Sequence, residues 1–197
     1  MIFGRKTPVS LQIETPRLTL ALADPAQAAL WARFHQENRA HFAPWDPLRD
    51  EDFFTAFTWQ LRLENARIQF QQGNAIHLAL IDNQSTEMIG QCSFSNIVQG
   101  PFMACHLGYS LAAAAEGKGL MFEALCAATN YVFATRDLHR IMANHMPANL
   151  RSARLLQRLG FEEEGYARSY LKIAGQWQDH VLNSLINPAH QPGQRPR

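Results

Sequence analysis

The stretch "AAAAEGKGLMFEAL", Ala112–Leu125, joins a glycine-rich turn to the start of a helix. Gly117 and Gly119 stand one residue apart, and Leu120 and Ala124 then open an apolar pattern with helical spacing. The run directly before it, "ACHLGYSL", reads as a strand. Such a turn gathers free backbone N–H groups and the positive end of the helix at one point. The stretch therefore predicts an anion-binding turn, with a plain strand-to-helix connection as the alternative.

Two nucleotide-binding motifs fail at this turn. A Walker A loop needs Ser or Thr after its Gly-Lys pair, and Gly119 stands there instead. A dinucleotide fingerprint needs a third glycine at position 122, which is Phe122. The physical features that remain are Gly117 and Gly119, which allow close approach of the backbone, and the positive charge of Lys118.

The remaining elements follow from apolar periodicity, capping residues and turn chemistry. Asp24-Pro25 and Asp50 are expected to cap the first two helices, and Gly73 and Gly160 to end the second and the last. Strands are expected over residues 16–23, 76–82, 88–98, 104–111, 140–146 and a final hairpin at 167–186, and helices over 26–38, 50–72, 119–135 and 149–160, with a loop at 41–52.

The resulting order, β-α-α-β-β-β-α-β-α-β-β, predicts a mixed sheet of the α/β (α+β) class. Strand–helix alternation in the middle of the chain implies parallel pairing there, and the hairpins make the remainder antiparallel. No internal repeat or linker divides the chain. We expect an N-terminal arm over residues 1–14, one domain over 15–187 and a flexible tail over 188–197.

Composition excludes several classes of protein. Apolar residues make up 47% of the chain and charged residues 18%, as in a globular domain, and the formal net charge of +1 argues against a DNA-binding electrostatic clamp. No apolar run has the length of a membrane span, and the N-terminus lacks a secretory signal. The three cysteines and eight histidines show no metal-ligand spacing. We expect a cytoplasmic, metal-free domain without a membrane or DNA partner, and the oligomeric state is left open.

A second segment, "HMPANLRSARLLQRLGF" at residues 145–161, gives a strand end, an Asn N-cap and a short helix. Together with the glycine turn it resembles the GNAT N-acetyltransferases, in which a [QR]-x-x-G-x-[GA] loop binds the pyrophosphate of acetyl-CoA. From about residue 15 to 186 the chain looks like the ribosomal-protein-alanine branch, most specifically in "LGFEEEGYA" and "GQWQDHV". The resemblance implies a mostly antiparallel central sheet with a parallel pair splayed at the acetyl-CoA site and helices on both faces.

The resemblance also implies the residues of the acetyl-CoA site. Backbone at "LGYSL" is expected to polarise the thioester, although Gly108 is open to reading as a strand bulge. The residues expected to bind acetyl-CoA are Leu107, Gly108, Tyr109, Gly117, Lys118, Gly119, Leu120, Met121 and Asn149. Glu116 departs from the family pattern, because it puts a carboxylate beside a phosphate site. We expect it to point to solvent or to pair with Lys118.

Ser152 and Asn144 are the expected catalytic residues. By resemblance Ser152 donates a proton or hydrogen bond to the leaving thiolate, and the alternative is a first-turn serine that bonds its own backbone. Asn144 cannot accept a proton and can only orient water or substrate. Asn149 is also an N-cap. His106, Glu87 and Asp179 are further candidates for relaying a proton, with satisfied structural roles as the alternative.

The acceptor is expected to be an N-terminal α-amine. Its pKa of about 7.7–8.0 leaves a useful neutral fraction, so a weak proton acceptor suffices. Trp45 and Trp177 are expected to wall the acceptor groove, with satellite core as the alternative, and the acidic loop at 46–52 is either a binding surface for a cationic peptide or a solvated helix start. Cys105 and Cys126 lack an activating partner, which favours direct attack over a covalent intermediate.

By resemblance the acceptor protein is a small-subunit ribosomal protein with an N-terminal alanine. Two alternatives remain open from the sequence. One is an acetyltransferase for a small amine such as a polyamine or an antibiotic, and the other is a CoA-binding ribosome-assembly factor with dispensable catalysis. The basic ends, "FGRK" and "QPGQRPR", support at most a weak, salt-sensitive contact with the ribosome.

Overall fold

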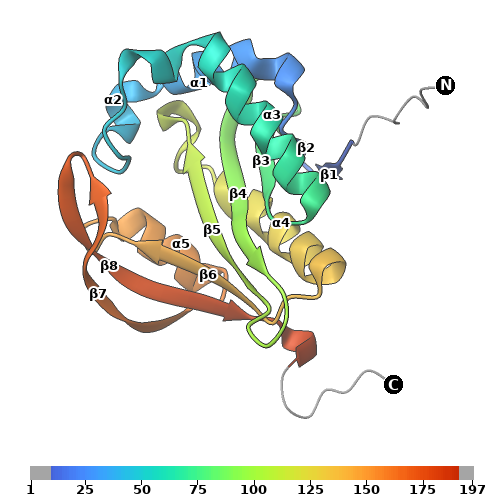
Figure 1. Cartoon of the computed structure of the whole chain (residues 1–197), viewed down its shortest axis with the longest axis vertical. Coiled ribbons are helices and arrows are strands. Elements are labelled where there is room, and N and C mark those ends of the chain that lie inside the picture. The colour runs from blue at the N-terminus through green and yellow to red at the C-terminus, as the bar shows by residue number, and fades with distance from the viewer. Residues whose placement is uncertain (1–9, 191–197) are drawn as a thin grey trace, which may run out of the picture.

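A computed structural model describes residues 10–190. Its centre is one sheet with the strand order β1-β2-β3-β4-β5-β6-β8-β7 (Figure 1). The strands are β1 (Gln12–Glu14), β2 (Leu18–Leu22), β3 (Ile76–Asp82), β4 (Met88–Val98), β5 (Ala104–Leu111), β6 (Arg140–His145), β7 (Glu162–Ile173) and β8 (Gln176–Ile186). The basic segments "FGRK" and "QPGQRPR" lie outside the described residues.

Strands β5 and β6 form the one parallel pair in the described part of the sheet. Their pairing covers three positions, Ala104–His106 against Arg140–Met142. Beyond these positions β6 bends away from β5 to lie with β8 and β7, so the sheet splits into two wings (Figure 1). The expected fold class is confirmed: a mixed, mostly antiparallel sheet whose parallel pair splays apart.

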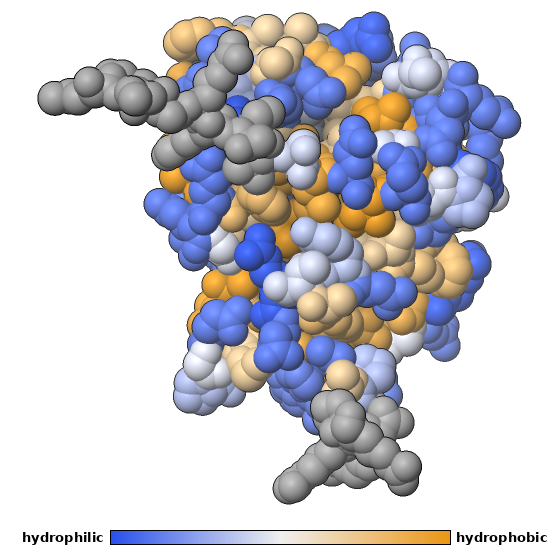
Figure 2. Space-filling model, turned by 90° about the vertical axis from the view of Figure 1, so that its right-hand side faces the viewer, coloured by the Kyte–Doolittle hydropathy of each residue, from blue (hydrophilic) through white to orange (hydrophobic). Residues whose placement is uncertain are grey.

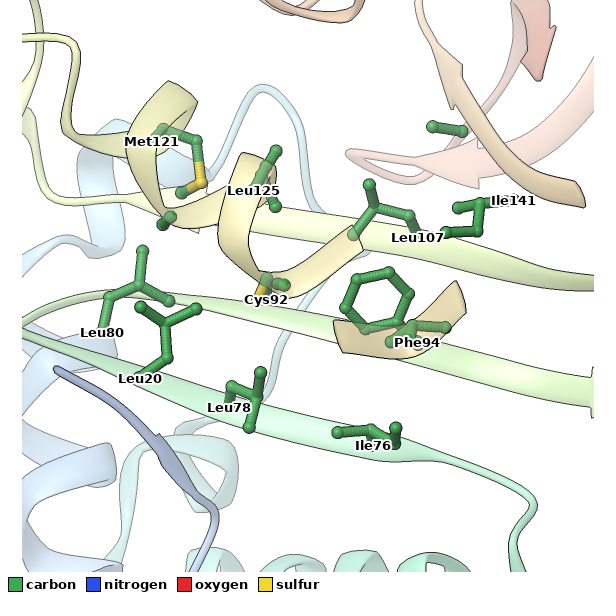
Figure 3. Packing of buried hydrophobic residues seen from close by; sticks show 14 of the residues in the cluster. Leu20, Ile76, Leu78, Leu80, Cys92, Phe94, Leu107, Met121, Leu125 and Ile141 are labelled. Atoms are coloured by element: carbon green, nitrogen blue, oxygen red, sulfur yellow. The ribbon is translucent and has the colours of Figure 1, made fainter. Parts of the chain in front are cut away.

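Helices cover both faces of the sheet. On one face, α1 (Ala28–Glu37) and α3 (Ala56–Gln72) bury an aromatic cluster that includes Trp31, Phe34 and Trp59. On the other face, α4 (Leu120–Arg136) and α5 (Leu150–Arg158) pack on the main core. Figure 3 shows side chains of β2, β3 and β4 directed towards Met121 and Leu125 of α4. The short helix α2 (Arg39–Phe42) stands above the gap between the two wings (Figure 1).

Capping side chains mark several helix starts, including Thr55 before α3 and Asn149 before α5. The Asp24 carboxylate accepts the N–H of Ala26 at 2.9 Å and so caps the 3-10 turn Pro25–Gln27, whereas the expected first helix begins as α1 at Ala28 without a side-chain cap. Gly73 ends α3 with φ +80°. The expected role of Asp50 was wrong in one respect: it caps the 3-10 turn Glu51–Phe54, while Thr55 caps α3. Thr55 has extended backbone, which divides the expected 50–72 helix in two.

The ends of the described chain join the fold. Residues Gln12–Glu14 of the expected arm pair with β2 as the edge strand β1, and Pro188–His190 form a 3-10 turn. None of the helices between residues 10 and 190 is long and apolar enough to cross a bilayer. Figure 2 shows hydrophilic side chains spread around apolar surface on the side where α3 and α4 lie.

Candidate active site

A cavity of about 920 Å³ lies between β5 and β6 where the two strands diverge. It is bounded by the ends of these two strands, the glycine turn, the start of α5 and the loop after α2. The residues predicted from sequence that line it are Trp45, Leu107, Gly108, Tyr109, Gly117, Gly119, Leu120, Met121, Asn144, Asn149 and Ser152. Lys118 and Trp177 are not among the lining residues, and Trp177 is 63% exposed.

The glycine turn presents backbone to the cavity. Gly117 and Gly119 have φ of +75° and +74°, in the left-handed region that disfavours side chains. No described heavy atom lies within 4 Å of where a Cβ on Gly117 would stand, so the space before the turn is open. The first turn of α4 has no side-chain N-cap, which leaves its N–H groups free for an anion. The turn fits a phosphate group.

Hydrogen bonds from Arg17 and Thr15 hold the glycine turn in place on the side away from the cavity. Arg17 donates to the Lys118 carbonyl at 2.8 Å and to the Glu123 carboxylate at 2.6 Å. Glu123 also accepts from the Thr15 hydroxyl at 2.7 Å. The region just before β2 therefore holds the turn in shape through backbone and carboxylate contacts. Lys118 contributes a carbonyl to this support.

The expected orientation of Glu116 was wrong. Its carboxylate pairs with Arg151 of α5 and lies 3.3 Å from His41 Nε2 on α2, and all three residues line the cavity. The side chain of Glu116 is 28% exposed, so it lies across the cleft and neither extends into solvent nor pairs with Lys118. Arg151, Arg154 and Arg158 also face this cavity from α5 and make its α5 side cationic.

Tyr109 and Ser152 form a pair of hydroxyls inside the cavity. Tyr109 Oη lies 2.6 Å from Ser152 Oγ, joining β5 to α5 across the gap. Burial raises the pKa of Tyr109 to about 12, against a smaller lowering by the bond to Ser152, so the phenol stays protonated at neutral pH. Asn149 caps α5 by accepting the Ser152 N–H at 3.1 Å, which leaves the Ser152 hydroxyl free for Tyr109 or a ligand.

Asn144 lies at the other side of the cavity. Its amide donates to the Tyr170 hydroxyl at 3.2 Å and its carbonyl accepts the Asn183 N–H at 3.3 Å. His180 of β8 also lines the cavity, and its ring centroid lies 5.4 Å from that of Tyr170. These contacts gather polar groups of β6, β7 and β8 on one wall.

The loop after α2 closes this end of the cavity. The Ala174 N–H donates to the Asp46 carbonyl at 2.9 Å, so the β7–β8 turn supports the loop. Burial raises the pKa of the Asp46 carboxyl, and Arg49 at 3.9 Å partly offsets the rise. Trp45 lines the cavity and is 38% exposed. An indole, a carboxylate and the polar wall opposite suit a ligand that carries an amine.

Other groups considered from sequence lie away from the cavity. His106, Glu87 and Asp179 do not line it, and the Asp179 carboxylate accepts from the Tyr166 hydroxyl and the Ser169 N–H. Burial raises the pKa of the Cys105 thiol to about 12 and also raises that of Cys126, so neither is a thiolate nucleophile at neutral pH. In the described chain no group of three His, Cys, Asp or Glu residues could hold a metal ion.

Sequence reasoning missed His41, Arg151 and His180 as cavity residues. Arg151 had a signal, since it stands between Asn149 and Ser152 on the same short helix. His180 lies inside "QWQDHV", a segment that had been singled out, but only strand register shows which face it occupies. His41 had no signal, because its position depends on the helix α2, and residues 41–52 were expected to be loop.

Comparison with known proteins agrees with this geometry. The sequence profile of the acetyltransferase (GNAT) domain matches residues 17–162, about three quarters of the chain. The chain is a GNAT acetyltransferase. The acetyl donor of GNAT enzymes is acetyl-CoA, and the match includes the glycine turn and the short helix α5.

Individual relatives of this GNAT chain are close in sequence and in structure. It is 47% identical over 193 residues to the [ribosomal protein uS5]-alanine N-acetyltransferase of Escherichia coli (strain K12), covering 98% of this chain and 100% of the relative. The crystal structure of ribosomal-protein-S5-alanine acetyltransferase from Vibrio fischeri matches with a TM-score of 0.88 and 38% identity, over 92% and 100% of the two chains. Mycobacterium smegmatis RimJ in complex with CoA-disulfide matches with a TM-score of 0.82 and 25% identity, over 95% and 89%.

Proposed function

We propose that this chain transfers an acetyl group from acetyl-CoA to the α-amine of the N-terminal alanine of ribosomal protein uS5, in the cytoplasm. The observation that carries the proposal is the 47% identity to a uS5-alanine N-acetyltransferase across 98% of the chain, which spans both sides of the cavity. A match confined to the cofactor half would support acetyl-CoA use alone. The full-length match extends to the loop after α2 and the β7–β8 hairpin.

In this proposal the glycine turn and α5 hold the diphosphate of acetyl-CoA. Gly117 and Gly119 allow close approach, and the free N–H groups of the first turn of α4 donate to phosphate oxygens. Arg154 and Arg158 add positive charge from the facing helix. Because the contacts are mainly to backbone, Met121 in place of a small residue leaves them intact.

The thioester lies against the part of β5 that has lost its parallel partner. Pairing with β6 ends at His106, so the β6-facing edge of Leu107, Gly108 and Tyr109 is open to the cavity. A backbone N–H there polarises the thioester oxygen. The Ser152 hydroxyl donates to the leaving sulfur, and Tyr109 holds that hydroxyl in place. Asn144 orients the amine or its water from the opposite wall.

The acceptor amine enters beside Trp45 and Asp46. Attack on the acetyl-CoA thioester is direct, since neither Cys105 nor Cys126 is a thiolate at neutral pH. A flat indole and a carboxylate at the mouth suit a peptide N-terminus, whose following residues extend outwards over the β7–β8 hairpin. We infer contact with the ribosomal protein, and we assign weak, salt-sensitive contact with the ribosome to the basic termini.

The test is turnover on a defined peptide. The purified chain, acetyl-CoA and a synthetic peptide with the uS5 N-terminal sequence are incubated, and intact mass is recorded. One added acetyl group on the free peptide, and none on the same peptide with a blocked α-amine, is the expected result. Spermidine is the comparison substrate for the small-amine alternative. Acetylation of spermidine but not of the peptide would overturn the proposal, and so would CoA binding with no turnover on either.

A further inference from the structure

Three histidines line the cavity, and their surroundings differ. His41 Nε2 lies 3.3 Å from the Glu116 carboxylate, so its ring nitrogen is engaged on the phosphate side. His145 and His180 share another geometry, in which Nδ1 lies 3.0 or 3.1 Å from a backbone carbonyl. A carbonyl oxygen accepts only, so Nδ1 carries the proton and Nε2 keeps its lone pair when the ring is neutral.

Strand register places these two rings on opposite faces of the sheet. In the β6–β8 ladder Asn144 stands opposite Leu182, and His145 stands opposite Val181. Directly opposed residues share a face and successive residues alternate, so His180 shares the face of Asn144. The 3.2 Å bond from Asn144 to Tyr170, and the ring contact of Tyr170 with His180, agree with this placement.

The two faces of the β6–β8 pair contact different parts of the molecule. His145 lies on the same face as Ala143 and Ile141, which pack into the core under α4 and α5, the helices of the phosphate side. The face of Asn144 and His180 carries the wall opposite the loop with Trp45 and Asp46. His180 is 5% exposed, so the ring has little contact with bulk water away from the cavity.

We propose that His180 is the proton acceptor for the attacking amine, acting through Nε2 directly or through one water. The inference rests on the proposed function and adds the residue that the α-amine chemistry requires. As the amine nitrogen forms the C–N bond, its proton passes to Nε2. The C–S bond breaks, and CoA leaves as a thiolate that accepts a hydrogen bond from the Ser152 hydroxyl. Solvent then supplies a proton to the thiolate and removes one from His180.

The charged and titratable groups near His180 are few. Asp179, its chain neighbour, accepts from the Ser169 N–H and from the Tyr166 hydroxyl, and these two bonds lower the pKa of its carboxyl. From β7 the facing group is the Tyr170 phenol, and from the loop after α2 it is Asp46, whose pKa is raised by burial. Asp46 is therefore the competing proton acceptor, and the experiment includes it.

The experiment measures kcat/KM for the uS5 peptide against pH in the full-length enzyme. Two groups must be deprotonated, the amine and His180, so the logarithmic plot falls at acid pH with a slope of two. His180→Gln is expected to lower kcat/KM at neutral pH by about 10²-fold, the low end for a general base, and to reduce the acid slope to one. The Kd for acetyl-CoA is expected to change by less than about twofold, because His180 lies on the acceptor face.

Two further measurements distinguish a catalytic role of His180 from a purely structural one. Added imidazole is expected to restore part of the rate of His180→Ala, which a purely structural role does not predict. His106→Gln is the matched control, a histidine of strand β5 in the same sheet that does not line the cavity, and it keeps a slope of two. If His180→Gln fails to fold, His180→Asn takes its place in the slope measurement.

The outcomes are distinct. A slope of two that persists in the His180 variants, or that falls to one in Asp46→Asn instead, overturns the assignment of His180. A wild-type slope of one does the same. If the wild-type enzyme gives no peptide product at any pH, the proposed function fails before His180 is tested, so the two failures are separable.

Discussion

Replacing Glu116 with Gln tests whether the negative charge between the glycine turn and α5 weakens the binding of acetyl-CoA. The wild-type carboxylate lies across the cleft in contact with Arg151 and His41. Glutamine keeps the shape and the hydrogen-bonding ability of the side chain and removes its negative charge. Arg151, whose side chain is 76% exposed, then becomes free to turn to the phosphates of acetyl-CoA. We expect acetyl-CoA to bind more tightly to this variant.

The size of the effect follows from the charge removed. Two unit charges roughly 8 Å apart interact by about 0.5 kcal/mol in water and by about 2 kcal/mol at an effective dielectric constant of 20. With 28% of its surface exposed, Glu116 lies between these limits. A gain of about 1 kcal/mol corresponds to roughly fivefold tighter binding. The pair with Arg151 is a surface ion pair, so its loss changes the free energy of unfolding by about 1 kcal/mol or less.

The assay is calorimetric titration of acetyl-CoA at low and high salt. The difference between wild type and Glu116→Gln is expected to shrink at high salt, because screening weakens exposed charges. Glu37→Gln is the matched control, since it removes the same charge from an exposed pair with Arg33 outside the cavity. Binding weakened threefold or more in Glu116→Gln would refute the reasoning and would mean that the Glu116–Arg151 contact holds the site in its binding shape.

Other substitutions probe the Tyr109–Ser152 hydroxyl pair, the sheet at Gly90 and the buried His35 of α1. Ser152→Ala is expected to lower kcat about 10- to 100-fold with little change in thermal stability, because Asn149 caps the Ser152 backbone and not its hydroxyl. Gly90→Ala is expected to cost about 2–3 kcal/mol in the free energy of unfolding, since its Cβ would lie 2.8 Å from the Ser110 carbonyl, and chemical denaturation measures this. Burial lowers the pKa of His35 to about 4, so the unfolded chain binds its proton first as pH falls below 6.5. Stability is then lost between about pH 6.5 and 4, by up to roughly 3 kcal/mol, and this loss should disappear from the pH dependence of unfolding in His35→Phe.

Much of the fold was predictable because periodicity and capping are local. Leu18, Leu20 and Leu22 alternate in sequence, and all three are buried in β2. The elements that the sequence did not predict depend on tertiary contacts or on the backbone conformation of a single residue. The three-residue strand β1 is too short for a pattern and is held by pairing with β2. The break at Thr55 depends on one residue with extended backbone.

Most of the predicted cavity residues lie on the side that sequence motifs describe, and on the other side only Trp45 and Asn144 were predicted. Gly117, Gly119 and Ser152 lie in contiguous segments whose chemistry follows from spacing. The partners of Glu116 were not predictable, because they come from α2 and α5 and meet only where β5 and β6 part. The Tyr109–Ser152 bond has the same cause, since it joins two elements across that gap.

The short helix α5 explains why these features depend on one another. It has nine residues, too few for a helix to be stable alone, and is held by the buried Leu156 and by the Asn149 cap. Its first turn carries both Arg151, which meets Glu116, and Ser152, which meets Tyr109. A shift of this helix therefore moves the proposed phosphate side and the proposed proton donor, Ser152, together. The splayed end of the parallel pair leaves room for α5 to approach β5, so the topological break in the sheet brings the glycine turn, Arg151 and the Tyr109–Ser152 pair to one cavity.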